Sequence, residues 1–501
     1  MRAGTIFFSA QSLVGALHRA GLYGPDVVGM FRFVILFGHC YGREVLTLLL
    51  LLNGCGSGLE PGSEPEPVSS PSVLLVILDT VRGDAVSAEV TPVLSRLAGL
   101  GVMYNDAHTS GTWSWPSHAS MFLGVAPWEH GAHFDPNGVQ VAGGDPTTVS
   151  LPRSDIPTLA ERFGDAGYQT VLATANPWLK EGLGLSRGYE VIRYSAKDAD
   201  VISHVRAGLQ ASGSRPLFLT VNLMTAHAPF SVETDCPWLA PHRATIDGPE
   251  LAPYRGPAGL TMTRGPTFHD IGAFAYARGE LSLSEEALSA FRAAYRCDVR
   301  RADARLGEVL QLWAQGNRGG IIAVTSDHGE LLGEHRQWEH GRGVWPELSH
   351  VPLVIAAPGA LKAGSVVTEP VLLHGLYGSL LSLAGLAKPA DTPLESGPRR
   401  IKAWSDSMWA THVGGRFAHD ATAYVEGGWA RVAWGDEEYF FNATVDPYFR
   451  NPVPAPPSAS ALRSAASTAF VDAIPSGGAP VMDEETQRMM EELGYLAPHK
   501  D

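Results

Sequence analysis

Two aspartates follow long apolar runs in this chain and could together bind a metal ion. Asp79 follows V-L-L-V-I-L at residues 73–78. The second apolar run, I-I-A-V at residues 321–324, stops at the polar residues Ser326, Asp327 and His328. Apolar runs of this kind suit strands that are buried on both faces of a parallel sheet. Carboxylate oxygens and an imidazole nitrogen are ligands for divalent cations. The two strand ends therefore predict a metal site formed by Asp79, Asp327 and His328.

The stretch T-S-G-T-W-S-W-P-S-H-A-S-M-F-L-G at residues 109–124 contains a candidate nucleophile. Pro116 and the small hydroxyl residues before an apolar run predict the start of a helix. The free backbone N–H groups and the dipole of a helix start suit a tetrahedral oxyanion. Ser114 would lie there, and a hydroxyl that touches a cation can attack sulfur or phosphorus. The alternatives are an ordinary turn serine at Ser114 and a capping carboxylate at Asp79.

Two further strands are expected to end near the same site. The apolar run at residues 217–223 precedes His227, and ligands of open α/β sheets bind outside the carboxyl ends of strands. We therefore expect a functional histidine at His227, with a purely structural histidine as the alternative. The strand at residues 169–174 leads into A-N-P-W-L-K, which places Asn176 and Lys180 on a loop above the sheet as candidate substrate contacts. An ordinary loop is the alternative for these two residues.

Five motifs follow one another along the chain: D-T-V-R-G-D from residue 79, T-P-V-L-S-R-L-A from 91, T-W-S-W-P-S-H-A-S from 112, N-L-M-T-A-H-A-P-F from 222 and D-H-G-E-L-L-G-E-H from 327. In this order they resemble the sulfatase family of the alkaline phosphatase superfamily, from about residue 72 to the end of the chain. The resemblance implies an α/β fold in which helices sandwich a large mixed, mostly parallel sheet, with a smaller C-terminal α+β subdomain.

The resemblance assigns a role to each matching residue. Ser114 falls at the nucleophile position, which true sulfatases oxidise to formylglycine. His227 resembles the histidine that protonates the leaving oxygen, and His340 lies where many members place a lysine or histidine against the transferred group. The residues that match the family's metal ligands are Asp79, Asp327, His328 and Ser114. The resemblance implies one divalent cation; Ca²⁺ is the first expectation, and the Asp, Asp, His set also suits Mn²⁺ or Zn²⁺.

Three positions depart from the usual family pattern. Thr80 stands in place of a second aspartate, His118 in place of the signature arginine, and His328 in place of an asparagine. These departures look more like the branch shared with phosphonate monoester hydrolases and phosphoethanolamine transferases. His118 is a candidate catalytic residue, with simple packing as the alternative.

The predicted function is metal-dependent hydrolysis of sulfuric esters, with Ser114 or its formylglycine as the nucleophile. One alternative is a phosphate or phosphonate ester hydrolase, or a phosphoryl-group transferase, that uses unmodified Ser114. A second is an inactive surface lipoprotein that binds glycans. The expected substrate is a sulfated or phosphorylated small molecule or glycan. The net charge of −15 argues against a nucleic-acid partner.

The first 55 residues resemble a bacterial lipoprotein signal. Arg43 precedes an apolar run at residues 45–52, which is too short to span a bilayer, and Cys55 follows. Lipidation at Cys55 would anchor an exported protein to a membrane, in the periplasm or at the cell surface. An ordinary secretory signal and a single uncleaved anchor are the alternatives. Residues 56–70 have the Pro, Gly, Ser and Glu composition of a flexible tether.

The remaining chain is expected to form a catalytic domain at residues 71–400 and a C-terminal subdomain at residues 401–501. Helices are predicted from residue 91 to about 102 and from 284 to about 315. Short alternating segments after residue 401 predict a small antiparallel sheet, followed by a Pro-, Ala- and Ser-rich linker at residues 452–467 and a final helix at 483–493. Cys236 and Cys297 form either a disulfide or two unpaired thiols, because sequence gives no distance between them.

Overall fold

The computed structural model describes residues 39–40, 43–44, 70–140, 148–211, 213–233, 236–263, 272–316, 319–387, 400–405 and 419–469. Residues Met1–Val68 form one unit, in which β1 (His39–Cys40) pairs antiparallel with β2 (Arg43–Glu44). The predicted lipidation site Cys55, nearly all of the tether and the final helix at 483–493 lie outside the described residues. No helix among the described residues is long and apolar enough to cross a membrane.

The second unit, Ser69–Asp501, is built around a nine-stranded sheet in the order β16-β4-β15-β12-β3-β9-β7-β8, with β17 beside β4. Its strands are β3 (Ser72–Leu78), β4 (Val102–His108), β7 (Gln169–Thr174), β8 (Val191–Tyr194), β9 (Leu217–Leu223), β12 (Gly320–Thr325), β15 (His350–Ala356), β16 (Ser365–Val367) and β17 (Val371–Leu372). β15 runs antiparallel to both of its neighbours, and the other pairs are parallel. The predicted mixed, mostly parallel sheet is confirmed.

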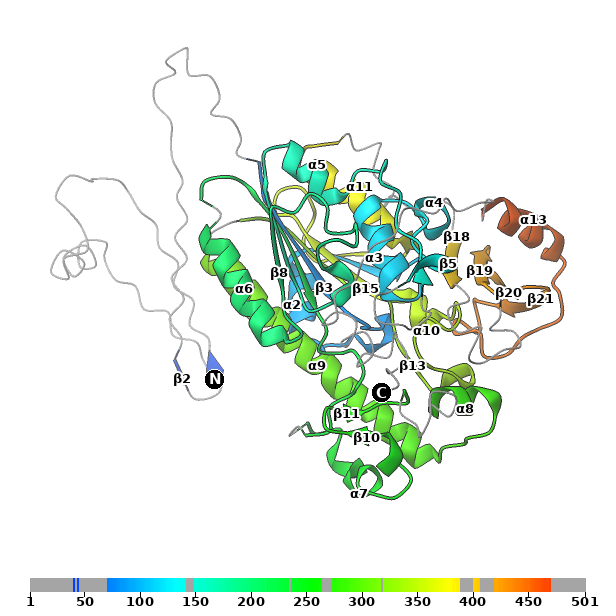
Figure 1. The fold of residues 1–501 in the computed structure, drawn as a ribbon. Coiled ribbons are helices and arrows are strands. Elements are labelled where there is room, and N and C mark those ends of the chain that lie inside the picture. The colour runs from blue at the N-terminus through cyan, green and yellow to red at the C-terminus, as the bar shows by residue number, and fades with distance from the viewer. Residues whose placement is uncertain are drawn as a thin grey trace, which may run out of the picture. The chain divides into compact units, whose positions relative to one another are not determined.

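Helices cover both faces of this sheet, as the resemblance implied (Figure 1). One layer contains α2 (Pro92–Leu100), α6 (Asp198–Ala211) and α9 (Glu285–Gln315), and the other contains α3 (Ser114–Leu123), α5 (Leu159–Asp165) and α11 (Leu376–Leu383). Three short helices, α4 (Pro127–His130), α7 (Arg243–Ile246) and α10 (Pro346–Ser349), lie in connecting segments. The strands β3 and β9 are buried along their whole length, as expected for β3 from its apolar run and for β9 although Thr220 and Asn222 interrupt it.

The long α9 begins where the sequence indicated. The Ser284 side chain accepts a hydrogen bond from the Ala287 N–H at 3.1 Å, which caps the helix. Cys297 of α9 forms a disulfide with Cys236, which decides the alternative that the sequence left open. Cys236 belongs to a long excursion between β9 and α9 that also contains β10 (Arg255–Gly256), β11 (Gly259–Leu260) and α8 (Gly272–Arg278). The disulfide thus fastens this excursion to the longest helix of the fold.

The C-terminal segment forms the predicted antiparallel sheet, with the strands β18 (Arg400–Ser405), β19 (Ala421–Glu426), β20 (Trp429–Trp434) and β21 (Glu437–Asn442). The predicted linker at residues 452–467 is wrong from residue 459 onward, because α13 (Ala459–Ala469) forms there. Leu462 and Ala466 of this helix are buried against Tyr424 and Phe440 of the sheet. Alanine favours helix, and this apolar contact stabilises one where composition alone indicated a linker.

The described residues of this unit form three further antiparallel strand pairs. β10 pairs with β11, β5 (Phe134–Gln140) with β6 (Thr148–Val149), and β13 (Leu331–Leu332) with β14 (Trp338–Glu339). The hairpin of β13 and β14 directly follows the D-H-G-E motif.

Candidate metal centre and nucleophile

The predicted site residues meet at one edge of the sheet. β12, β3, β9 and β7 are consecutive neighbours and parallel, so their carboxyl ends lie together. Asp79 follows β3, Asp327 follows β12, and Asn176 follows β7. These three side chains are fully buried. The strand order therefore forms a site from segments that are far apart in the sequence.

Asp79 and Asp327 form the acidic part of the site. Asp79 Oδ2 accepts hydrogen bonds from the Asn176 and Asn222 side-chain amides at 2.8 and 3.3 Å, while its Oδ1 has no hydrogen-bond partner among the described residues. Burial, together with the charge of Asp327, raises the pKa of Asp79 well above its usual range. A buried carboxylate oxygen without a donor is a position that a cation can fill.

Both carboxylate oxygens of Asp327 accept hydrogen bonds, in contrast to Asp79. Its Oδ1 accepts from the Thr80 and His328 N–H groups at 3.2 and 2.9 Å. Burial alone would raise the pKa of Asp327, but His328 and these N–H groups hold it below its usual value. Asp79 and Asp327 can therefore bind a cation between them, with one carboxylate already held in its charged form.

Ser114 is the first residue of α3, as the sequence predicted, and its hydroxyl contacts Asp327. Its hydroxyl lies 3.1 Å from Asp327 Oδ2 and 3.1 Å from the Asn176 side-chain nitrogen. The same oxygen lies 3.4 Å from His328 Nε2. Ser114 thus lies at a helix start, beside a carboxylate, an amide and an imidazole, where a nucleophile and an anion-binding group are both favoured.

Three histidine rings pack against one another in sequence, from His328 next to Ser114 through His340 to His227. The ring centroids of His328 and His340 are 4.4 Å apart, and those of His340 and His227 are 4.9 Å apart. The Nδ1 atoms of His227 and His328 lie 2.6 and 2.9 Å from the carbonyl oxygens of Ala228 and Gly329. A carbonyl oxygen only accepts, so each Nδ1 carries the hydrogen and each Nε2 has a lone pair.

Burial keeps these three rings neutral near pH 7. It lowers the pKa of His227 and of His340 to about 3 and that of His328 to about 4. The Nε2 atom of His328 is therefore available either to a cation or to the Ser114 hydroxyl hydrogen.

His118 faces the site and does not merely pack against apolar side chains. Its Nδ1 lies 2.8 Å from the Ser114 carbonyl oxygen, and its Nε2 lies 3.3 Å from the Asn222 side-chain nitrogen. Ligand atoms of Asp79, His118 and Asp327 all lie within 4.8 Å of one another, so these three residues form one possible metal triad. For His118 to bind a metal through Nε2, Asn222 would have to release that atom. His328 Nε2 lies 3.4 Å from the Ser114 hydroxyl and 3.3 Å from Asp327 Oδ2, so it is a second candidate nitrogen ligand.

The two predicted substrate-binding residues, Asn176 and Lys180, have different surroundings. Asn176 touches both Asp79 and Ser114, which is closer to the reacting atoms than the sequence indicated. The Lys180 ammonium lies 4.4 Å from the centroid of the Tyr194 ring. Sequence reasoning missed Asn222, although a polar residue inside the run L-F-L-T-V-N-L was a visible signal.

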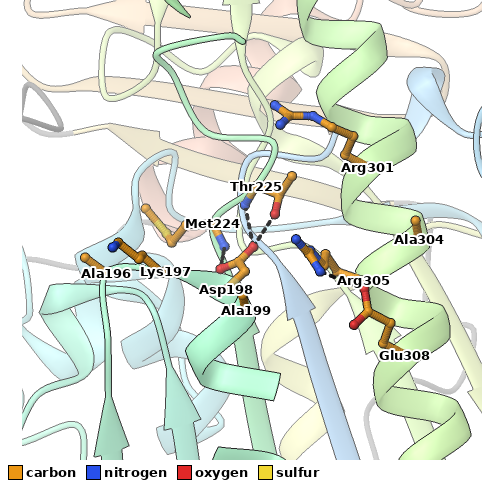
Figure 2. Close-up of a pocket in the computed structure, with 10 residues that line it drawn as sticks. All are labelled: Ala196, Lys197, Asp198, Ala199, Met224, Thr225, Arg301, Ala304, Arg305 and Glu308. Carbon is orange, nitrogen blue, oxygen red and sulfur yellow. Dashed lines mark hydrogen bonds and ion pairs between the residues drawn. The ribbon is translucent and has the colours of Figure 1, made fainter. Parts of the chain in front are cut away.

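Asp198 holds the turn that leads to His227 through hydrogen bonds. This carboxylate accepts from the Met224 and Thr225 N–H groups at 2.9 Å and from the Thr225 hydroxyl, as Figure 2 shows. Behind the turn, between α6 and α9, lies a cavity of about 510 Å³ whose lining includes Arg305.

Thr80 has an uncommon backbone conformation next to Asp79. Its φ is 59°, a region that β-branched residues rarely adopt. The Tyr295 hydroxyl donates to the Thr80 carbonyl at 2.8 Å and accepts from the Arg82 N–H at 2.9 Å. Tyr295 therefore holds both ends of the turn that follows β3.

Replacing Tyr295 by phenylalanine is expected to lower the free energy of unfolding by about 1–3 kcal/mol, because two buried backbone groups lose their partner. The turn at Thr80 would relax, which would move Asp79 and weaken the binding of divalent cations. Denaturant unfolding and cation titration measure the two effects. Tyr189→Phe is the matched control, since it removes a buried hydroxyl that bonds to a threonine of β9. Equal losses of cation affinity in both variants would contradict the role of Tyr295.

A family model described as Sulfatase matches residues 71–386. Arylsulfatase K from Canis lupus familiaris is 31% identical over 132 residues, which cover 26% of this chain and 24% of the relative. The chain thus spans about a quarter or less of the length of the first curated relatives that it matches. A delta 4,5-hexuronate-2-O-sulfatase from Bacteroides thetaiotaomicron is 21% identical over 363 residues, or 66% of this chain and 71% of the relative.

A solved structure shares the fold. Phosphonate monoester hydrolase SpPMH from Silicibacter pomeroyi has a TM-score of 0.58 and 18% sequence identity, and the match covers 80% of this chain and 94% of that chain. At this identity the likeness shows the fold alone. It confirms the α/β architecture that the motifs predicted.

Proposed function

This chain belongs to the sulfatase family, and from that membership we propose that it hydrolyses sulfuric esters with the help of a divalent cation. Ser114, or a formylglycine derived from it, is the proposed nucleophile. The observation that carries the proposal is the place of the Ser114 hydroxyl, 3.1 Å from both Asp327 Oδ2 and the Asn176 amide nitrogen, at the start of a helix.

The residues proposed to hold the cation are Asp79, Asp327, His328 and Ser114. The unpartnered Oδ1 of Asp79 and the lone pair on His328 Nε2 support this set. When bound, a divalent cation polarises the transferred group and lowers the pKa of the nucleophile's hydroxyl. Ca²⁺ is proposed first, and the nitrogen ligand also suits Mn²⁺ or Zn²⁺.

The proposed proton transfers follow from the histidine tautomers. His227 is neutral with a lone pair on Nε2, so it must gain a proton before it can act as an acid. The nucleophile is proposed to release its proton to solvent, and His227 to gain one from solvent, before the new O–S bond forms. His227 then donates its proton to the leaving oxygen as the ester S–O bond breaks. Sulfate finally leaves the nucleophile: water attacks the sulfur of a serine sulfate, or the second hydroxyl of a formylglycine diol loses its proton and expels sulfate to restore the aldehyde, which water rehydrates. His340 is proposed to stabilise charge on the nonbridging oxygens.

The experiment that tests the proposal compares three esters on one preparation from the native host. Turnover of 4-nitrophenyl sulfate that exceeds turnover of the phosphate monoester and of a phosphonate monoester is the expected result. Mass spectrometry of the Ser114 peptide belongs to the same experiment, because conversion to formylglycine removes two hydrogen atoms. Turnover of the phosphorus esters alone, with an intact serine, would replace sulfate chemistry by the second candidate.

That second candidate is a phosphate or phosphonate ester hydrolase, or a phosphoryl-group transferase, with unmodified Ser114. His118 in place of the family's arginine favours it, because that arginine belongs to the signature of the residue to be oxidised. A third candidate is an inactive glycan-binding surface lipoprotein. Glycan binding that survives Asp327→Asn, with no turnover of any ester, would favour the third candidate.

The proposed substrate is a sulfated glycan or small ester, which the name of the hexuronate sulfatase relative supports. We further propose that the protein is exported and anchored through Cys55. The disulfide between Cys236 and Cys297 supports export, since such bonds persist in oxidising compartments. Fractionation of the native host tests the anchor, and recovery of the intact chain from the cytosol would contradict it.

A further inference from the structure

Glu330 and His340 face each other at the end of the hairpin that follows the metal-site motif. In this hairpin Leu331 pairs with Glu339, and Leu332 pairs with Trp338. The next step of the same register places residue 330 opposite residue 340. The side chains meet there, with Glu330 Oε1 at 3.0 Å from His340 Nδ1. The hairpin register therefore creates this contact.

His340 differs from its two neighbours in how its ring is held. His227 and His328 each use Nδ1 to contact a carbonyl oxygen of the residue that follows. At His340 the partner of Nδ1 is a side chain from the other strand of a hairpin. An imidazole with one nitrogen fixed presents the other on the opposite side of the ring. Glu330 thus determines the direction of His340 Nε2.

The contacts of Glu330 do not show that this residue stabilises the fold. The side chain is fully buried, and its Oε2 has no hydrogen-bond partner among the described residues. Burial, together with the charges of Glu339 and Asp327, raises the pKa of Glu330 well above its usual range, although Arg342 and Arg82 act to lower it. A buried carboxyl oxygen without a partner destabilises a fold, and an apolar side chain would avoid that cost.

We propose that Glu330 is a positioning residue for His340 in the sulfate-ester chemistry of this site. Its hydrogen bond at Nδ1 holds the imidazole so that Nε2 meets the transferred group. This inference rests on the proposed function and deepens it, because it names the residue on which the action of His340 depends.

The test compares Glu330→Ala with Glu330→Gln. The amide of glutamine can still bond to Nδ1, so its turnover should stay within about threefold of the wild type, whereas alanine should lower kcat by about 10- to 100-fold with a smaller change in KM. Glu347→Gln is the matched control. Glu347 is a buried carboxylate in the same region, with Oε2 at 3.3 Å from His335 Nε2, and its substitution should leave kcat unchanged.

A second measurement does not depend on turnover. In protein with ¹⁵N-labelled histidine, the signals of His340, assigned with His340→Gln, report which ring nitrogen is hydrogen-bonded. Glu330→Ala should change them, and Glu330→Gln should preserve a bonded Nδ1. Wild-type kcat in Glu330→Ala, a glutamine variant as impaired as the alanine variant, or His340 signals that do not respond to Glu330→Ala would each overturn the inference. A wild-type protein inactive on all sulfate esters would instead refute the proposed function, and the histidine signals would still test the contact.

Discussion

Replacing Asp327 by asparagine is expected to abolish the cation-dependent rise in thermal stability and to lower kcat/KM by about 10³-fold or more. Asp327 serves three groups at once, because its carboxylate accepts from the Thr80 N–H, the His328 N–H and the Ser114 hydroxyl. The amide nitrogen of asparagine would face one of these donors. The variant would therefore lose charge at the metal site and disturb the nucleophile in the same step.

Without divalent cations, the same substitution should lower the melting temperature. The surroundings of Asp327 hold its pKa below its usual value, so folding favours the charged carboxylate, and asparagine loses that stabilisation. Removal of the charge also relieves the repulsion that raises the pKa of Asp79, which offsets part of the loss. A lost response to Ca²⁺, Mn²⁺ and Zn²⁺, in a variant that still melts cooperatively, separates a damaged metal site from a damaged fold.

The matched control for this experiment is Asp303→Asn. Asp303 is also a buried aspartate, and it accepts from the Val93 and Leu94 N–H groups at the start of α2, away from the site. Its substitution should weaken the fold and leave the cation response intact. Undiminished cation binding by Asp327→Asn, measured by calorimetry, would show that this carboxylate is not a ligand.

Replacing Ser114 by alanine is expected to lower kcat by about 10⁴- to 10⁶-fold, as loss of a nucleophile does in other hydrolases. The hydroxyl is the candidate group that can form a bond to the transferred group, and alanine offers no oxygen. The fold should persist, because Ser114 lies at a helix start whose cap does not use its side chain. The variant should therefore still respond to divalent cations, though more weakly if Ser114 is itself a ligand.

Ser120→Ala is the control for Ser114. Ser120 is a buried serine of the same helix whose hydroxyl bonds to His130 at 3.0 Å, away from the reacting atoms. Steady-state kinetics with 4-nitrophenyl sulfate measure kcat for both variants. Activity of Ser114→Ala equal to that of Ser120→Ala would exclude Ser114 as the nucleophile and would leave only a role in positioning.

The positions of Asp79 and Asp327 could be predicted from the sequence, because strands buried on both faces of a parallel sheet consist of nearly continuous apolar residues. The apolar runs before Asp79 and Asp327 predicted two strands and the edge at which both carboxylates lie. Ser284 and Ser114 were recognised as helix starts from their neighbours. In each case the local pattern and the global fold agree, which is why the inference held.

The rest depended on distances that a linear pattern does not contain. Asn222 was hidden inside an apolar strand, and Asn176 was expected at the substrate but contacts Asp79 and Ser114. The disulfide of Cys236 needed two segments to be placed side by side. α13 was missed because its stability comes from contact with the C-terminal sheet and not from its composition.

The position of β3 has a consequence for how the chain folds as it is synthesised. β3 is the first strand of the main sheet along the chain, and its two neighbours are β9 and β12. Ser72 therefore cannot pair with Gly320 until that much later residue has been synthesised. Until β12 is in place, β3 can have only β9 beside it, and an apolar strand with an open edge invites aggregation. The proposed metal site needs both Asp79 and Asp327, so it can form only after β12 has paired with β3, and recovery of cation binding on refolding would report that pairing.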